Sequence, residues 1–350
     1  MEQDKIKVGI TQGDINGISY EVIIKTLMDS RINDLCVPIV YGSAKVAAYH
    51  RKTLGIQNFN LNIAKDAGKV NTKKSNVINC TDENIRVELG KSVINAGKAS
   101  VQALDKAVED LKNGKIDVLV TGPINKENIQ SEEFNFPGHT EYLMNNFQAR
   151  EVLMLMISDV MKVGVATGHV SMREVPEILT QDLILRKLNI LNKSLLQDFK
   201  IRKPRIAVFG LNPHASDGGV LGKEENEVII PAIQRAKEDG IMAFGPYPAD
   251  GFFGSRNLRK FDAILAMYHD QGLAPFKAIS FDEGVNFTAG LDIVRTSPDH
   301  GTAYELAGKN EASPASFRNA LFLALDIYRN RKEYQELTSN PLESQDKSDI

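Results

Sequence analysis

Five of the six histidines of this chain lie in short segments rich in glycine, proline, asparagine and threonine. Three of them, His169, His214 and His269, closely follow apolar runs that are typical of buried strands. These runs are residues 163–167, 206–211 and 263–267. In α/β proteins ligands bind where strands end at one edge of the sheet, and several neutral imidazoles together are usual ligands of zinc or a similar ion. A single such histidine is more often structural, but three in matching contexts predict a metal site.

The composition is that of an ordinary globular protein, and it excludes several classes of partner. The 350 residues allow two domains or one large one, and apolar and charged residues make up 42% and 25% of the chain. A net charge of −3 gives no footprint for nucleic acid or an anionic membrane. No leader-like segment opens the chain, and no apolar stretch approaches the roughly 20 residues that cross a bilayer. We therefore expect a cytoplasmic protein that binds neither nucleic acid nor membranes.

Strand-like and helix-like segments alternate along nearly the whole chain. Apolar runs predict strands at 5–11, 37–41, 117–121, 151–157, 162–166, 205–210 and 261–267. Helical spacing predicts helices at 19–28, 44–54, 96–113, 224–239 and from Ser313-Pro314 to about 332. A further helix begins after Thr180 and has one apolar face, made of Ile184, Leu188, Leu191, Leu195 and Phe199. The pattern predicts an α/β fold with a mainly parallel sheet, followed by a disordered polar tail over 338–350.

Several common catalytic signatures are absent from the sequence. The first strand is followed by Gly13-Asp-Ile-Asn-Gly17 rather than a Gly-x-Gly-x-x-Gly turn, and no Gly-Lys-Ser/Thr phosphate loop occurs. A Gly-x-Ser-x-Gly elbow is also missing, which disfavours a serine hydrolase. The two cysteines, Cys36 and Cys80, form no disulfide framework or zinc motif, and we expect both thiols to be inert and partly buried.

Seven short motifs occur in one order along the chain. They are Thr121-Gly-Pro-Ile-Asn-Lys126, Pro137-Gly-His-Thr-Glu141, Ala166-Thr-Gly-His169, Gly210-Leu-Asn-Pro-His-Ala215, Tyr247-Pro-Ala-Asp250, His269-Asp-Gln-Gly272 and Arg295-Thr-Ser-Pro-Asp-His-Gly-Thr-Ala303. Each motif alone is weak, but the ordered set resembles the 4-hydroxythreonine-4-phosphate dehydrogenase family of pyridoxal phosphate biosynthesis, over about residues 8–331.

The resemblance implies an isocitrate/isopropylmalate dehydrogenase-like α/β fold, with two α/β domains around a central cleft, in an obligate homodimer with a shared active site. The expected division is 1–128 plus 300–335 for the cofactor side, and 129–299 for the metal, substrate and dimer side. The implied reaction is the metal-dependent, NAD- or NADP-linked oxidation of 4-phosphooxy-L-threonine to 2-amino-3-oxo-4-phosphooxybutanoate. That product then loses carbon dioxide to give 3-amino-2-oxopropyl phosphate, a step towards pyridoxine 5'-phosphate.

The resemblance also implies that His169, His214 and His269 bind zinc, magnesium or cobalt, with one histidine contributed across the dimer interface. The chemistry of the reaction agrees with such a site. A metal ion bound to the substrate hydroxyl lowers its pKa as hydride leaves carbon, and its Lewis acidity stabilises the oxygen charge that develops during decarboxylation. A thiolate-free histidine site also leaves coordination positions open for substrate.

Five further residues match the substrate-binding positions of the family: His139, Thr140, Lys277, Asn286 and Arg295. Arg295 is suited to gripping a carboxylate or phosphate through two parallel hydrogen bonds, whereas Lys277 acts as a point charge. Both cations follow apolar residues, where an unpaired charge is costly, so an ordinary solvated role is disfavoured. The less favoured alternative for His139 is a loop histidine bonded to nearby backbone.

The cofactor site is less specific in the sequence. Asp14, Gly17 and Lys126 are candidates through close backbone approach and positive charge, although a simple strand-to-helix turn explains the glycines equally well. His300 either supports cofactor binding or caps the following helix. His50 lies in a helix flanked by Lys and Arg, and we expect it to be solvent-exposed and without a role.

The chain departs from the family pattern at a few positions. Gln12 stands where the first turn usually has proline, and Ser19 where glycine is usual. The other departures are Ser216-Asp217 for Gly-Glu, Gly251 for threonine, Ala289 for leucine and Asp292 for proline. None removes an implied metal or substrate ligand, so they bear on substrate and cofactor preference rather than on the reaction.

Other functions fit parts of the same pattern. A sibling branch of the family oxidises 4-phospho-threonate or 4-phospho-erythronate, which lack the amino group. A three-histidine zinc hydrolase would need no nicotinamide cofactor. A catalytically silent ligand-binding protein should have lost metal ligands, yet all three histidines are present.

Overall fold

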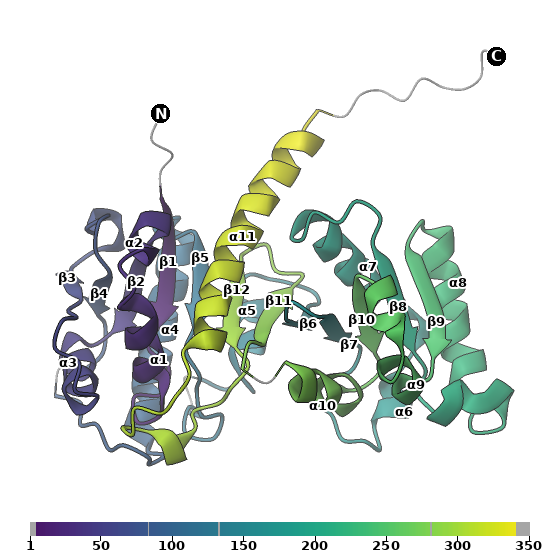
Figure 1. Cartoon of the computed structure of the whole chain (residues 1–350), viewed down its shortest axis with the longest axis horizontal. Helices are drawn as coiled ribbons and strands as arrows, with labels where there is room; N and C mark the ends of the chain where they lie inside the picture. Colours follow the sequence, from purple (N-terminus) through teal and green to yellow (C-terminus); the bar gives the residue numbers. More distant parts are fainter. Residues whose placement is uncertain (1–4, 83, 132–133, 281, 341–350) are drawn as a thin grey trace.

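The computed structural model describes residues 5–340 except 83, 132–133 and 281. Within these residues the framework is one sheet of twelve strands in the order β3-β4-β2-β1-β5-β12-β11-β6-β7-β10-β8-β9 (Figure 1). The strands are β1 (Ile6–Thr11), β2 (Cys36–Gly42), β3 (Asn62–Ala64), β4 (Asn76–Asn79), β5 (Val118–Thr121), β6 (Leu153–Ile157), β7 (Lys162–Val165), β8 (Arg205–Phe209), β9 (Met242–Tyr247), β10 (Ala263–Ala266), β11 (Val285–Ala289) and β12 (Arg295–Pro298). The predicted α/β fold with a mainly parallel sheet is confirmed.

Helices cover both faces of the sheet. The longer ones are α1 (Ser19–Leu27), α3 (Ala44–Thr53), α4 (Ile94–Lys112), α5 (His139–Asn146), α7 (Gln181–Gln197), α8 (Ile230–Glu238), α10 (His269–Ile279) and α11 (Ala315–Thr338). Short turns are α2 (Ile32–Leu35), α6 (Val175–Ile178), α9 (Ala249–Phe253), η1 (Ala67–Lys69), η2 (Pro213–Gly219), η3 (Glu225–Ile229), η4 (Arg256–Lys260) and η5 (Tyr304–Leu306). Apolar residues of α1, α7, α8 and α11 share one core cluster, whereas α4 packs in a second and α9 and α10 in a third. None of the helices in the described part of the chain is long and apolar enough to cross a membrane.

The centre of the sheet differs from its two ends. Here β11 pairs antiparallel with both β12 and β6, and β6 pairs antiparallel with β7. The remaining pairings between described strands are parallel. Figure 1 shows α11 crossing this central region, where it packs on β5, β11 and β12 and also touches α1 and α7. One helix therefore ties the two ends of the sheet together.

Several element boundaries differ from the sequence predictions. The segment predicted as one helix over 224–239 begins with the π turn η3 and becomes α-helical only at Ile230. Phe199 lies beyond the end of α7, where its ring packs edge-on against Phe287 of β11. The last helix starts at Ala315 and continues to Thr338, so the predicted tail begins inside it. Residues 341–350 of that tail lie outside the described residues.

The prediction that His50 is exposed was wrong. Its side chain is 1% exposed, stacks on Tyr20 of α1, and pairs through Nε2 with the carbonyl oxygen of Ile15 at 2.8 Å. Burial lowers its pKa to about 4. Gln12 explains part of this arrangement, because its amide accepts a hydrogen bond from the Tyr20 hydroxyl and donates one to the carbonyl of Ala99. These contacts join the turn that follows β1 to helices α1, α3 and α4.

The cysteines behave as expected of inert thiols. Cys36 is fully buried at the start of β2, and Cys80 is partly buried just after β4. Burial raises the pKa of each thiol to about 12. The nucleophilic thiolate form is therefore disfavoured at both positions.

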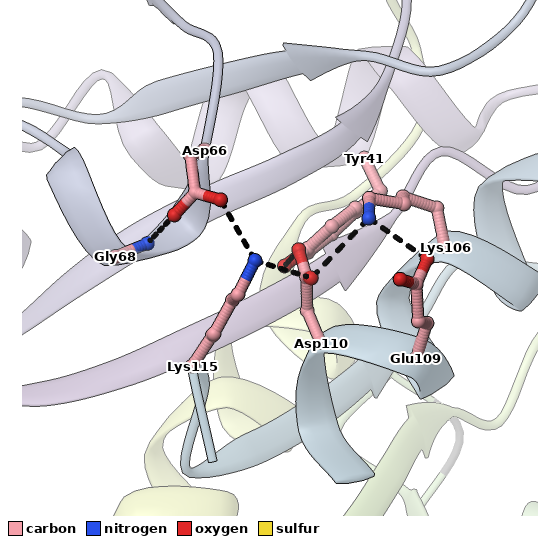
Figure 2. A network of polar contacts seen from close by, with 7 residues as sticks. All are labelled: Tyr41, Asp66, Gly68, Lys106, Glu109, Asp110 and Lys115. Carbon is pink, nitrogen blue, oxygen red and sulfur yellow. Dashed lines mark hydrogen bonds and ion pairs between the residues drawn. The ribbon is translucent and has the colours of Figure 1, made fainter. Parts of the chain in front are cut away.

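A polar cluster joins the end of α4 to the sheet (Figure 2). Asp110 is 1% exposed and accepts a hydrogen bond from the Tyr41 hydroxyl at 3.0 Å. Lys106 and Lys115 approach the same carboxylate at 3.4 and 3.6 Å, and Lys115 also pairs with Asp66 at 2.7 Å. We call these five residues the Asp110 cluster. Its members neutralise one another within the protein.

Candidate active site

Three of the histidines named from the sequence follow neighbouring strands. The order β7-β10-β8 is parallel throughout, so His169, His269 and His214 all leave the carboxyl ends of adjacent strands. The rings of His169 and His269 lie 5.5 Å apart between centroids and are tilted by 41°. Two imidazoles on one tetrahedral ion, with metal–nitrogen distances of about 2.0–2.1 Å, have centroids roughly 5 Å apart. The spacing of this pair therefore fits a shared metal ion.

The partners of the two rings also suit metal binding. Nδ1 of His269 lies 2.7 Å from a carboxylate oxygen of Asp270, which leaves Nε2 free. A carboxylate behind an imidazole is the usual support for a metal-binding histidine. The pKa of His169 is lowered by burial first, and then by the nearby Lys126 and His269. Both effects favour the neutral, ligating form of its ring.

His214 lies in a turn with unusual backbone geometry. His214, Ala215, Ser216 and Asp217 all have φ between 50° and 66°, in the left-handed region that disfavours side chains. The buried carboxylate of Glu225 accepts 2.7 Å hydrogen bonds from the backbone N–H groups of Leu211 and Asn212 and so anchors the start of the turn. Strained backbone of this kind gathers at ligand sites.

The described residues contain no group of three or more His, Cys, Asp or Glu side chains poised for a metal ion. The structure of one chain thus brings His169 and His269 together, but it does not bring His214 to them. The assignment of His214 as a third ligand stays a prediction.

Arg295 is the central feature of the substrate side of the site. It is only 3% exposed, and its guanidinium donates to the hydroxyls of Thr121 at 2.7 and 3.1 Å and of Thr288 at 3.2 Å. No described carboxylate forms an ion pair with it. Burial lowers its pKa to about 10, with the more distant Glu141 acting in the opposite direction. A buried cation held only by neutral hydroxyls is suited to an incoming anion.

His139 and Thr140 open helix α5 beside this arginine. Both side chains are half-buried at the first two positions of the helix. The pKa of His139 is lowered well below its usual value, first by burial and then by the positive charges of Arg295 and Lys126. Its neutral ring can therefore share the region with two cations and a bound anion.

The remaining predicted substrate residues lie on β11 and α10. Lys277 pairs with Asp299 at 3.2 Å and is 49% exposed, so its ammonium remains accessible. Oδ1 of Asn286 and Nε2 of His300 are buried without a hydrogen-bond partner among the described residues. An unpaired buried polar atom is costly, and these two belong to residues named from the sequence for the substrate and the cofactor, so both are candidates for contact with a ligand.

The predicted cofactor residues divide into two kinds. The carboxylate of Asp14 is buried and accepts hydrogen bonds from Asn128 and Tyr304, both at 2.8 Å, which favours a structural role. A Cβ on Gly17 would stand 2.4 Å from the carbonyl oxygen of Thr302, so this glycine permits close packing. By contrast, Lys126 is exposed, and its Nζ lies 3.4 Å from Nε2 of His169.

The sequence predicted Thr121 only as part of a candidate cofactor segment, residues 121–126, and it gave no role to Thr288 or Glu141. Thr121 and Thr288 hold Arg295, and nothing in their local sequence reveals this long-range contact. Glu141 stands inside the quoted Pro137–Glu141 motif, but a lone glutamate in a first helical turn resembles an ordinary helix-stabilising residue. Together the site offers imidazoles for a metal, cations for an anionic substrate, and one unpaired carboxylate.

Comparison with known proteins gives one consistent family. Residues 34–324 match the family model described as pyridoxal phosphate biosynthetic protein PdxA. The chain is 53% identical to a 4-hydroxythreonine-4-phosphate dehydrogenase of Bacteroides thetaiotaomicron, covering 99% of this chain and 95% of the relative. It is 36% identical to a putative D-threonate 4-phosphate dehydrogenase of Oceanobacillus iheyensis, covering 91% and 97%. A crystal structure of 4-hydroxythreonine-4-phosphate dehydrogenase from Klebsiella pneumoniae matches with a TM-score of 0.81 at 30% identity, covering 94% and 99%.

Proposed function

The chain belongs to the family of pyridoxal phosphate biosynthetic protein PdxA, and on this premise we propose that it is a 4-hydroxythreonine-4-phosphate dehydrogenase. It oxidises the C3 hydroxyl of 4-phosphooxy-L-threonine and yields 2-amino-3-oxo-4-phosphooxybutanoate, which decarboxylates to 3-amino-2-oxopropyl phosphate. The observation that carries this proposal is the buried guanidinium of Arg295, which is held by two hydroxyls and lacks an opposite charge in the described protein. The substrate supplies that charge.

The substrate is held by cations and by unpaired polar atoms. Arg295 grips one anionic end, and the accessible ammonium of Lys277 adds a second positive charge. Oδ1 of Asn286 accepts a hydrogen bond from a substrate hydroxyl or ammonium. His139 stays neutral beside Arg295 and, with Thr140, completes the contacts at the start of α5.

His169, His269 and His214 would hold the divalent ion, which we propose to be zinc, magnesium or cobalt. When bound, the ion supplies Lewis acidity to the substrate's oxygen atoms in both the oxidation and the decarboxylation. The protein's part is to present neutral imidazoles. Asp270 orients His269, and burial together with Lys126 disfavours a proton on His169.

When bound, NAD or NADP would supply the hydride acceptor for this oxidation. We propose that residues 1–128 with 300–335 carry this cofactor and that residues 129–299 carry the metal, the substrate and the dimer contact. Lys126 is exposed at the junction of the two parts, and Nε2 of His300 is an unpaired donor or acceptor there. Asp14 and Gly17 shape the turn between β1 and α1. In this proposal the backbone of that turn approaches the cofactor.

We further propose a homodimer in which each site takes a ligand from both subunits. Apolar side chains are exposed beside two of the histidines: Val170 and Met172 follow His169, and Val220 and Leu221 follow His214. Val220 is 80% exposed, which is unusual for valine and fits a surface that is covered on association. A third ligand from a partner subunit also accounts for the separation of His214 from the other two rings. The expected location of this dimer is the cytoplasm.

A second candidate is oxidation of the amino-lacking threonate ester, because one relative is named a putative D-threonate 4-phosphate dehydrogenase. A zinc hydrolase or a silent binding protein is not retained, because the family is one of dehydrogenases.

The test is a panel of phosphorylated four-carbon acids, with and without an amino group, offered with NAD or NADP and each metal. We expect NAD(P)H absorbance to rise fastest with the amino ester, to vanish in chelator and to return when metal is restored. Free 4-hydroxythreonine should react poorly, because binding energy at the phosphate positions the reacting carbon. Absence of cofactor reduction with every ester and metal would overturn the proposal.

A further inference from the structure

Glu141 is the third residue of α5, and its carboxylate is half-buried. It makes no hydrogen bond or ion pair with any described residue. Three other first-turn carboxylates are engaged: Glu21 pairs with Lys25, Asp182 with Arg235, and Asp270 with His269. Asp34, Glu177 and Asp250 are also without a partner among the described residues, but their side chains are exposed to solvent. Glu141 differs from them because its unpaired carboxylate is half-buried.

The surroundings of Glu141 are positively charged, but no charge is close enough to neutralise it. A Cβ built on Gly138 would stand 3.6 Å from Oε2 of Glu141 and 3.9 Å from Cε of Lys126, so both side chains border the same small space. Burial lowers the pKa of Arg295 and of His169, and the negative charge of Glu141 opposes that lowering at both groups. The carboxylate therefore shares a space with Lys126, whose Nζ lies 3.4 Å from Nε2 of His169, one of the proposed metal ligands.

The substrate's charges show what this carboxylate is for. The amino ester carries two anionic groups and one ammonium, whereas the threonate ester carries a hydroxyl in place of the ammonium. Arg295 and Lys277 serve the anions, but they repel the ammonium. The other nearby carboxylates, Asp270 and Asp299, are already paired with His269 and Lys277. Unlike these two carboxylates, Glu141 has no hydrogen-bond or ion-pair partner among the described residues.

We propose that Glu141 binds the substrate's ammonium and thereby makes the enzyme prefer the amino ester to its amino-lacking analogue. This inference rests on the proposed function, and it assigns the substrate class within it. The ammonium forms an ion-paired hydrogen bond with this half-buried carboxylate, whereas the hydroxyl of the analogue can donate only a neutral hydrogen bond, which is weaker.

The ordinary alternative is that Glu141 only stabilises α5 through the helix dipole. That role predicts a slightly less stable protein when the charge is removed, with both esters affected alike. Discrimination between the two esters is therefore the measurement that separates the two roles.

The variant is Glu141→Gln, which keeps shape and removes charge, with Glu141→Asp as the conservative partner. Steady-state kinetics with both esters is combined with calorimetric binding of each ester to metal-loaded protein without nicotinamide. For Glu141→Gln we expect kcat/KM and affinity for the amino ester to fall about tenfold to a hundredfold. Values for the threonate ester should stay the same or improve, and Glu141→Asp should recover part of the loss.

Asp182→Asn is the matched control, because it removes a first-turn carboxylate from α7, and it should leave the ratio of the two esters unchanged. Equal losses on both esters, or no loss on the amino ester, would overturn the role of Glu141. A parent enzyme that prefers the threonate ester would also overturn it, while leaving the dehydrogenase assignment intact. A parent that oxidises neither ester would overturn the proposed function itself.

Discussion

The Asp110 cluster and the candidate active site both place charged side chains against buried surface, but they are completed in different ways. Asp110 is met by a hydroxyl and two ammonium groups from its own chain (Figure 2). Arg295 is equally buried, yet its neighbours are the neutral hydroxyls of Thr121 and Thr288. The charge of Asp110 is balanced by cations of the same chain, although its Oδ1 accepts no hydrogen bond, whereas the charge of Arg295 has no paired carboxylate among the described residues.

This difference separates stability from function along the same sheet. A buried charge without an opposite charge costs free energy, and a fold keeps such a group where function requires it. Removing a member of the Asp110 cluster should therefore damage the fold and spare the chemistry. Removing a member of the active site should spare the fold and damage the chemistry.

The largest effect is expected at His169 and His269, the two adjoining histidines of the proposed metal site. His269→Ala removes one of two adjoining imidazoles, so metal affinity and turnover should each fall about 100-fold or more. The ring is partly exposed, and its loss should change the free energy of unfolding by less than about 1 kcal/mol. Metal competition with a chromophoric chelator and urea unfolding measure the two quantities. Full activity of this variant in chelator would remove His269 from the metal site.

The Asp110 cluster should show the reverse behaviour. Asp110→Asn leaves two lysines without their shared carboxylate, and we expect the free energy of unfolding to fall by about 2–3 kcal/mol. Values of kcat and KM should not change. Glu109→Gln is the control, because it removes an exposed partner of Lys106 and should have little effect. A large loss of activity in folded Asp110→Asn would show that the two regions are not independent.

Substitutions at Arg295 should change activity and stability in opposite directions. Arg295→Lys keeps the charge but loses the forked geometry, so kcat/KM should fall about tenfold or more. Arg295→Met should abolish measurable turnover and yet raise the free energy of unfolding by about 1 kcal/mol, because an unmatched buried charge disappears. Thermal unfolding without ligands gives the second quantity. A less stable Arg295→Met protein would mean that the threonine hydroxyls already satisfy the guanidinium.

Much of the fold could be predicted because its signals are local. Apolar runs located β7 and β10 to within a few residues, and the strand ends identified the histidines that follow them. The antiparallel centre could not be predicted in this way. The pairing of β11 with β6 and β12 joins segments far apart in the chain, and no local pattern reports it.

The sequence named candidate residues for the site but not their geometry. The left-handed turn at His214 has no glycine at its first four positions, so its sequence gave no sign of strain. The free carboxylate of Glu141 and the hydroxyls around Arg295 depend on long-range packing. The prediction for His50 was wrong for a related reason. The lysine and arginine beside it in the sequence suggested an exposed side chain, but its ring faces α1.

The smallest effect is expected at His50. Substitution of this residue tests whether a buried histidine that is hydrogen-bonded within its own chain is purely structural. Its native pKa is about 4, whereas an unfolded histidine has its usual value near 6.5. Between these values the unfolded chain binds more protons, so stability falls as the pH drops below 6.5. From pH 7.5 to 5.5 this group should cost about 1 kcal/mol in the wild type, and nothing in His50→Gln. Urea unfolding at both pH values measures the difference, and kcat/KM should be the same for both proteins. Identical pH slopes would mean that the ring is not held neutral. The hydrogen bond between His50 and the carbonyl oxygen of Ile15 indicates a purely structural role. A weaker metal affinity in His50→Gln would contradict that role, because it would mean that this histidine is coupled to the active site.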